Sequence, residues 1–537
     1  MTLSLGSSPL ALLRGYADDL RAYPYLCTEQ MSAVALPMIA LYRARTAAGA
    51  EAGDTVRLRS EAGRALDLIM RRQRSDGGIG LWSATDWTPP WMTANAGEVL
   101  LEARAAGFAV PDTVVAAMVG YLTAALERQE NMALTVGLRD TEVHANLTER
   151  VAIADFLSRA GKRNQPLENE LTRRLGQLPA DDRLRFALTL ARAGDERMAR
   201  RIVEPFWALA VVEGRTVSLP DSLQSRFYLP SAVRMPSYLL LSTMAVEPGH
   251  PLVTPLLETV VGRGRRRDPD QWWNTQDHAM AVRAVDAWQR RFPAANRRPL
   301  EVRSGGRTVF ATAGVHVTGD SVRSLRDLLR GRRPGPLPLE IAARGAGDPG
   351  FFYLTLTETP RVAPVNPEDR GIRVERWYED YRTGKPVTSI AEGELVRVRL
   401  RVTVPSERSF VVLDDPLPAG LEAIDLSLRT VGGIGGPGAL ETGGPTGQGG
   451  GGAAPRWGFG SWDSGWWSPF DHRELRDDRV VYAARLLWGG SYTASYLARA
   501  TTPGTFTRPQ AHAEEMYNPA VFGRSDGGTF TVTARAP

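Results

Sequence analysis

The feature that most constrains the fold is a change in the spacing of apolar residues near residue 298. Up to about residue 292 they recur every three or four positions, as at Met31, Val34 and Met38, which is the spacing of a buried helix face. Farther along, in the stretch 396–404, five aliphatic residues alternate with three arginines and a threonine. This period of two is typical of a half-buried strand. The chain is therefore predicted to be helical first and then β.

In the helical part, the spacing of the apolar residues predicts about a dozen helices. The connections between them are short and rich in Gly, Pro and Asp, which favours helical hairpins. Six such hairpins closed in a ring would form an α/α toroid. Strands are expected at Thr308–Val317, Leu337–Ala342 and Phe351–Thr357, and longer antiparallel strands follow, which together favour a β-sandwich. A Gly-rich segment, 431–454, cannot bury enough apolar surface to order itself and is predicted to be a surface loop.

Composition excludes several classes of protein. The net charge is only +5, and the basic cluster at 263–267 has no interleaved aromatic residues, so nucleic-acid binding is not expected. No apolar run approaches the ~20 residues of a membrane helix, and Met1–Leu10 does not resemble a signal peptide. A single cysteine and six scattered histidines give no metal-ligand spacing, and no cofactor is predicted.

The single cysteine, Cys27, lies three residues before Gln30 at the start of a predicted helix. Residues at this spacing share one face of a helical turn, and the helix N-terminus favours a thiolate. Attack of that thiolate on the Gln30 carboxamide would expel ammonia and leave a cyclic thioester, an electrophile toward amines and hydroxyls. Water would hydrolyse such a bond, so an apolar cover is needed, and Tyr23 and Tyr25 are candidates for part of it.

Other interpretations of Cys27 remain open. A lone cysteine at a helix start is usually a small buried hydrophobe. A catalytic cysteine would need a histidine base, and none of the six histidines lies in a peptidase signature. An α/α-toroid enzyme such as a terpene cyclase is disfavoured because the Asp-x-Asp-Asp acid motif is missing and the β part does not fit.

The segment Tyr23-Pro-Tyr-Leu-Cys-Thr-Glu-Gln30 resembles the thioester motif of bacterial alpha-2-macroglobulins, with Glu29 inside the Cys-x-Glu-Gln core. Further segments resemble the same family over nearly the whole chain: Asp76–Trp82, Trp91–Ala94, Asn274–Ala279, Val411–Leu421, Tyr496–Ala500, Pro503–Phe506 and Ala513–Pro519. The resemblance implies a multidomain fold, α then β. A CUB-like remnant strand would occupy 1–10, an α/α-toroid thioester domain 11–298, a CUB-like β remnant 299–365, and a C-terminal macroglobulin-type β-sandwich 366–537.

The resemblance also implies a function. The chain would be the thioester-bearing part of a broad-spectrum endopeptidase inhibitor, not an enzyme, that captures target proteases covalently through their amines. Tyr23, Tyr25, Met516 and Tyr517 would shield the thioester of Cys27 and Gln30. The other expected partners are upstream macroglobulin domains of a parent protein. The expected location is periplasmic or extracytoplasmic, with membrane attachment only through a lipid anchor of that parent.

Two departures from the family pattern matter. Leu26 stands where the family has Gly, and a Leu would cost energy if this position needed a positive φ. The chain also begins almost at the thioester domain, so it is expected to be a fragment, a split gene product or a degenerate homologue. The alternative function is a binding or structural module in which the thioester does not form. In some relatives a histidine directs the thioester toward hydroxyls, and His144 lies at a plausible separation downstream. A solvent-facing or packing histidine is the favoured interpretation, so amine preference is predicted here.

Overall fold

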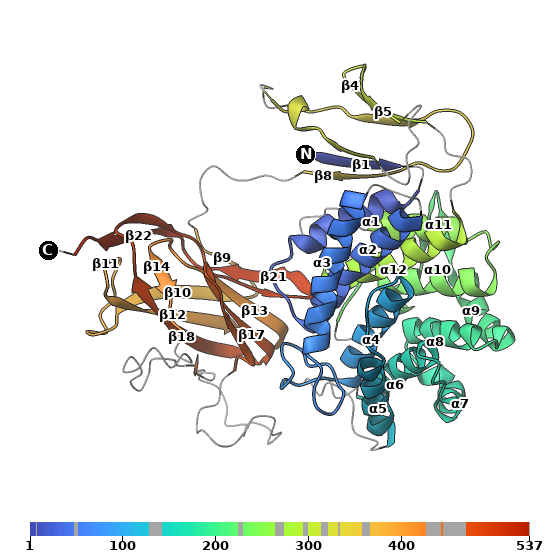
Figure 1. Ribbon diagram of the computed structural model, residues 1–537, viewed down its shortest axis with the longest axis horizontal. Helices are drawn as coiled ribbons and strands as arrows, with labels where there is room; N and C mark the ends of the chain where they lie inside the picture. Colours follow the sequence, from blue (N-terminus) through green and yellow to red (C-terminus); the bar gives the residue numbers. More distant parts are fainter. Residues whose placement is uncertain are drawn as a thin grey trace. The chain divides into compact units, whose positions relative to one another are not determined.

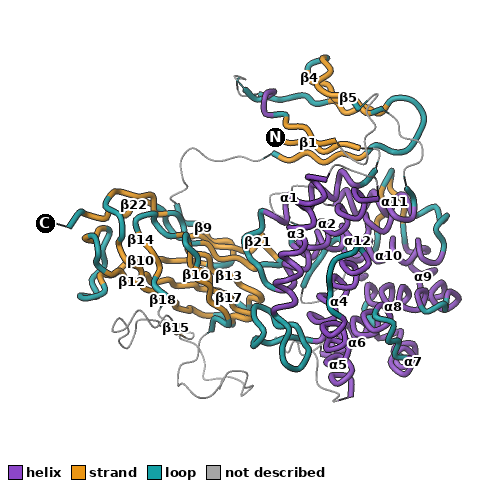
Figure 2. The backbone as a smooth tube through the Cα atoms, viewed as in Figure 1, coloured by secondary structure: helices purple, strands orange, loops and turns teal. Residues whose placement is uncertain are grey.

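The computed structural model describes residues 1–6, 8–47, 52–127, 142–223, 229–263, 273–293, 299–312, 321–330, 333, 335–356, 366–425, 442–443 and 469–535. Helices occupy the first half of the chain and strands the second (Figure 2). This confirms the predicted change from helix to strand. The chain divides into two compact units, Met1–Arg267 with Thr275–Glu358, and Asp268–Asn274 with Thr359–Pro537.

The first unit contains twelve α-helices in the described part of the chain. They are α1 Leu10–Arg21, α2 Thr28–Ala47, α3 Ala52–Arg71, α4 Pro90–Ala105, α5 Asp112–Glu127, α6 Glu142–Arg159, α7 Gln165–Arg173, α8 Ala180–Arg192, α9 Glu196–Leu209, α10 Arg234–Val246, α11 Val253–Arg263 and α12 Thr275–Arg291.

The even-numbered helices form an inner ring (Figure 1). Each of α2, α4, α6, α8 and α10 packs against the next even-numbered helix, and α12 packs against α2, which closes the ring. The odd-numbered helices pack outside it; for example, α1 contacts α2 and α12, and α9 contacts α8 and α10. Six helical hairpins thus form an α/α toroid, as predicted.

Burial follows the two layers of the ring. The inner helix α2 is buried from Thr28 to Leu41 on nearly all sides, and its Pro37 lies within the helix. The outer helix α9 buries a single stripe, residues Ala199, Ile202, Val203 and Phe206, at the spacing of an amphipathic helix. Its N-terminus is capped by Asp195, whose carboxylate accepts the N–H of Met198.

Three small antiparallel sheets belong to the described part of the first unit, and the smallest pairs β2 (Val211–Glu213) with β3 (Thr216–Ser218). Strand β1 (Thr2–Gly6) lies between β6 (Ser321–Ser324) and β8 (Phe351–Thr355), and β4 (Leu300–Ser304) lies between β5 (Arg307–Ala311) and β7 (Glu340–Ala343). Leu3, Leu5, Leu300, Val302 and Leu325 form a common core. The predicted strand Thr308–Val317 is shorter than expected, since β5 ends at Ala311, and residues 313–317 lie outside the described ones.

The second unit is built from three sheets. Their strand orders are β10–β12–β18–β14, with β15 also on β18; β16–β17–β13–β20–β21–β9; and β11–β22–β19. The bounds are β9 Glu368–Arg370, β10 Arg373–Asp380, β11 Ser389–Ala391, β12 Leu395–Val404, β13 Arg408–Pro416, β14 Leu421–Ala423, β15 Thr442–Gly443, β16 His472–Leu475, β17 Arg479–Leu487, β18 Gly490–Ala500, β19 Gly504–Arg508, β20 His512–Glu515, β21 Asn518–Arg524 and β22 Gly528–Thr533.

The longer sheets share one core between their inner faces, as in a β-sandwich. Strand β12 shows why: its five aliphatic residues from Val396 to Val404 are buried, and its arginines face outward. On that outer face Arg399 donates to Glu379 of β10 at 2.9 Å, and the guanidinium of Arg401 lies over the Trp377 ring. The predicted loop 431–454 lies outside the described residues except for β15.

Candidate functional site

Cys27 and Gln30 meet in the first turn of the inner helix α2. Both side chains are fully buried. The Gln30 side chain folds back, so that its carbonyl Oε1 accepts the backbone N–H of Cys27 at 2.9 Å. The spacing of three residues thus brings the Gln30 carboxamide to the backbone of the residue that carries the thiol. The N–H also polarises the carbonyl that a thiolate would attack.

The segment around Cys27 is held by a loop that follows α3. Arg72 donates to the Leu26 carbonyl at 2.6 Å and to the Thr28 hydroxyl at 3.2 Å. The Thr28 hydroxyl donates to the carbonyl of Gly80 at 2.6 Å, and the Thr28 N–H donates to the carbonyl of Leu81 at 2.8 Å. The motif Asp76–Trp82 thus has a clear role, because its backbone fixes the start of α2.

Leu26 does not need a left-handed backbone. Among the non-glycine residues that the structure describes, only Phe410 has a positive φ. The energetic cost that a Leu would meet in that conformation therefore does not arise at position 26.

Glu29 is held from a distant part of the chain. Its fully buried carboxylate accepts the Thr275 hydroxyl at 2.8 Å and the Gln276 side-chain amide at 2.5 Å. The Gln276 carbonyl in turn accepts Arg234 at 2.8 Å. Both oxygens of the carboxylate are thus bound by the first turn of α12. These two hydrogen bonds from α12 hold Glu29, and with it the start of α2, next to the Cys27–Gln30 pair; Glu29 is called the anchor of α2 below.

Two tyrosines lie upstream of the pair. Gln30 Nε2 lies 3.4 Å from the hydroxyl of Tyr23 and donates to it. The rings of Tyr23 and Tyr25 meet edge to face with centroids 5.4 Å apart, and Tyr25 is buried while Tyr23 is half-buried. Of these two predicted shielding residues, Tyr23 therefore contacts the Gln30 carboxamide directly, and Tyr25 packs against Tyr23.

The other two predicted shielding residues, Met516 and Tyr517, belong to the second unit. They form the turn between β20 and β21, and both are buried. The N–H of Met516 donates to the Phe410 carbonyl at 3.0 Å, and Asn274 donates to the Tyr517 carbonyl at 2.8 Å. Their action on the Cys27 thioester stays a prediction. The side chain of His144 lies outside the described residues.

Sequence reasoning missed several residues of the site. Thr275 and Gln276 lie in the segment Asn274–Ala279, whose only signal in the sequence is its resemblance to the family. No local signal marks Arg72 or Arg234, because each acts on a residue more than 40 positions away.

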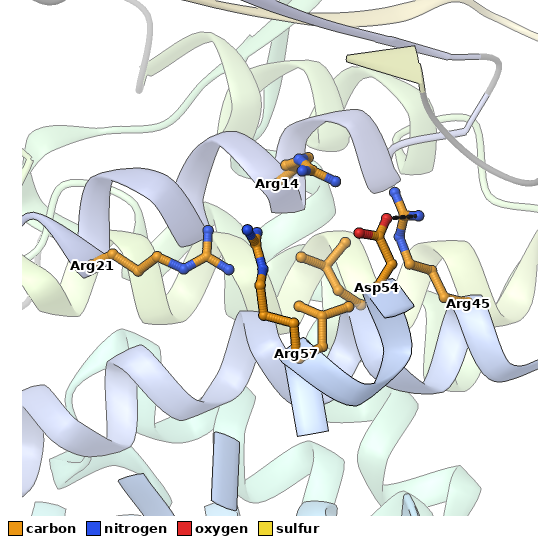
Figure 3. Close-up of a pocket in the computed structure, with 7 residues that line it drawn as sticks. Arg14, Arg21, Arg45, Asp54 and Arg57 are labelled. Carbon is orange, nitrogen blue, oxygen red and sulfur yellow. Dashed lines mark hydrogen bonds and ion pairs between the residues drawn. The ribbon is translucent and has the colours of Figure 1, made fainter. Parts of the chain in front are cut away.

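Apart from the buried Cys27–Gln30 turn, the first unit has a cleft among α1, α2 and α3 (Figure 3). It is lined by Arg14, Arg21, Arg45, Asp54 and Arg57, with two leucines. Arg21 pairs with Glu61 at 2.6 Å, Arg45 pairs with Asp54 at 2.8 Å, and Arg57 lies 3.6 Å from Glu61. This cleft is therefore mostly an ion-paired helix surface. In the described part of the chain, no group of three or more His, Cys, Asp or Glu side chains could hold a metal ion.

No helix among the described residues is both long and apolar enough to span a membrane.

Comparisons with known proteins agree on one family. Residues 371–520 match the family model "Bacterial Alpha-2-macroglobulin MG10 domain". The chain is 26% identical over 538 residues to an alpha-2-macroglobulin of Xylella fastidiosa, covering 96% of this chain and 29% of that protein. It is 24% identical over 533 residues to the alpha-2-macroglobulin of Escherichia coli, covering 96% and 28%. The chain thus spans less than a third of the length of these relatives.

Solved structures show the same fold. Salmonella alpha-2-macroglobulin reacted with methylamine superposes with a TM-score of 0.72 at 22% identity, over 99% of this chain and 31% of that one. Native alpha-2-macroglobulin from Escherichia coli, from domain MG7 to the C-terminus, gives a TM-score of 0.70 at 20% identity, over 99% and 77%. The helical part followed by β-sheet domains matches the C-terminal region of these proteins.

Proposed function

Since this chain is homologous to the C-terminal region of bacterial alpha-2-macroglobulins, we propose that it is the thioester-bearing part of an endopeptidase inhibitor. The observation that carries the proposal is the buried turn in which the N–H of Cys27 holds the Gln30 carbonyl. The thiol and the carboxamide are thereby kept on one helical turn, away from water.

The proposed chemistry has two steps. Cys27 Sγ bonds to the Gln30 side-chain carbonyl carbon, the bond from that carbon to nitrogen breaks, and the thiol proton leaves with the nitrogen as ammonia. Later a lysine amine of a protease attacks the same carbon, the carbon–sulfur bond breaks, and the Cys27 thiol is restored. Each thioester is consumed once, so the chain acts as an inhibitor and not as an enzyme.

Protection from water is divided between two parts of the chain. Tyr23 and Tyr25 cover the Gln30 side, with support from the 3.4 Å contact between Tyr23 and Gln30. Met516 and Tyr517 complete the cover, as they would in the family. The toroid 11–298 would be the thioester domain, 1–10 and 299–365 CUB-like strands, and 366–537 a macroglobulin-type sandwich. Proteases and upstream macroglobulin domains are the proposed partners, in a periplasmic or extracytoplasmic setting.

The test is the intact mass of freshly purified protein, measured before and after methylamine, with Cys27→Ala as the control. A native mass lighter by one ammonia, followed by a methylamine adduct and one new thiol, is expected. Adduct formation by glycerol at a rate comparable to methylamine would contradict the predicted amine preference. A native mass equal to that of the plain sequence across gentle preparations would refute the thioester and favour a non-reactive binding module.

A further inference from the structure

The turn Met516–Tyr517 has an unusual geometry for its length. Glu515 pairs with Asn518 across the hairpin of β20 and β21, so only two residues form the connection. Two-residue hairpin loops favour types I′ and II′, in which a positive φ matches the twist of the strands. Neither Met516 nor Tyr517 has a positive φ. The pairing of β20 with β21 also shifts register between Glu514 and Glu515, so the hairpin is irregular beside the turn, and contacts from outside the hairpin help to fix it.

Phe410 provides two of these contacts. It lies in β13, the neighbour of β20, and it is buried. Its carbonyl accepts the N–H of Met516 at 3.0 Å, and its ring meets the Tyr517 ring edge to face with centroids 5.3 Å apart. One residue thus binds both members of the turn.

Phe410 itself is strained. Its φ is +52°, and no other described residue except glycine has a positive φ. A bulky aromatic residue rarely adopts this conformation because its Cβ crowds the backbone. Such an outlier persists only where the surroundings fix it, and it is often found where geometry serves function.

The adjacent residue is tied to the turn as well. The N–H of Ser409 donates to the Glu515 carboxylate at 3.1 Å, and Asn518 donates to the same carboxylate at 3.3 Å. Ser409 and Phe410 together therefore contact Glu515, which precedes the turn, and both residues of the turn itself. The contact from Asn274 to the Tyr517 carbonyl adds a third support.

We propose that Phe410 is a positioning residue for the thioester cover, and that its left-handed backbone aims its carbonyl at Met516 and its ring at Tyr517. The proposal rests on the proposed function, in which this turn shields Cys27. It assigns a role to a residue that does not touch the thioester.

The test combines two measurements on the full chain. Phe410→Ala removes the ring and keeps the Cβ that disfavours the left-handed backbone, whereas Phe410→Gly removes both the ring and that penalty. The matched control is Phe530→Ala, which removes an equally buried ring that packs on Tyr378 in the same unit. The first readout is hydrogen exchange in a peptide that spans 512–518, and the second is the rate of thioester loss in water.

We expect Phe410→Ala to raise both rates up to about tenfold, the effect of losing one buried aromatic contact with Tyr517. Phe410→Gly should have a smaller effect on exchange, and Phe530→Ala should change neither rate. Unchanged exchange in both Phe410 variants, or an equal change in the control, would overturn the proposal. If the wild-type chain contains no thioester, the proposed function fails, while the exchange measurement still decides whether Phe410 positions the turn. Should Phe410→Ala not fold, the glycine variant supplies both readouts.

Discussion

The buried partners of Glu29 allow a sharp test, because each carboxylate oxygen accepts from a named donor, one from Thr275 and the other from Gln276. In the Glu29→Gln variant, only one side-chain oxygen remains at position 29. Gln276 is held by Arg234 with its amide toward that position, so the remaining oxygen accepts from Gln276 and the new amide faces the Thr275 hydroxyl. The Thr275 hydroxyl oxygen accepts the N–H of this new amide, but the hydroxyl proton no longer has the carboxylate oxygen that accepted it. We expect a loss of about 1–3 kcal/mol of local stability, since two charge-assisted hydrogen bonds become neutral and one buried donor is orphaned.

The reverse change provides the control within the same network. Gln276→Glu alone places a second buried carboxylate against Glu29 and should be more harmful. The swap that combines both changes restores every partner. The amide now at position 29 donates to the carboxylate now at position 276, and its oxygen accepts from Thr275, while the relocated carboxylate also accepts from Arg234. The swap should therefore be more stable than the sum of the single variants by about 2–3 kcal/mol.

The assay is hydrogen exchange in peptides from α2, because unfolding of a chain with two units need not follow a two-state transition. A loss of 1–3 kcal/mol corresponds to exchange about 5- to 150-fold faster. Glu61→Gln, which removes the partly exposed partner of Arg21, should change stability by less than about 1 kcal/mol. Unchanged exchange in Glu29→Gln, or a swap no better than the sum of its parts, would refute this account of the Glu29 anchor.

Three further predictions concern the scaffold. Asp415→Ala leaves the guanidinium of Arg376 buried without its carboxylate partner and should destabilise the sandwich by about 3–5 kcal/mol in denaturant unfolding. Burial raises the pKa of Asp182 to about 7, so the stability that its proton provides is present below about pH 4 and is lost as the pH rises through 7; Asp182→Asn should flatten this dependence in melting curves between pH 5 and 8. Gly97→Ala places a Cβ against the Phe156 ring and should lower the stability of the toroid by about 1–3 kcal/mol, despite a better helix propensity.

Local spacing was enough to predict much of the fold. The helix period predicted about a dozen helices, and the described part of the chain has twelve, while alternation over 396–404 predicted β12. The short strands β4 and β6 were missed. In β4 the buried Leu300 and Val302 alternate with only two charged residues, too few positions for a reliable pattern.

The site was predictable only in its local part. The pairing of Cys27 with Gln30 follows from their spacing, because three residues make less than one helical turn. The anchor of Glu29 could not be predicted from periodicity, because its partners lie 246 and 247 residues away. The left-handed backbone of Phe410 could not be predicted either, because its sequence context is an ordinary strand and its contacts with Met516 and Tyr517 come from residues more than 100 positions away.

The closure of the helical ring has a consequence for how the chain acquires reactivity during synthesis. Helix α2 emerges from the ribosome early, but α12, which completes its environment and binds Glu29, is made nearly 250 residues later. Contacts of such sequence separation form late in folding, because a long loop must first be closed. A nascent chain therefore exposes Cys27 as an ordinary thiol. Under the proposed function, the thioester of Cys27 and Gln30 would therefore form only after the toroid is complete, so amines that meet the nascent chain would find no electrophile.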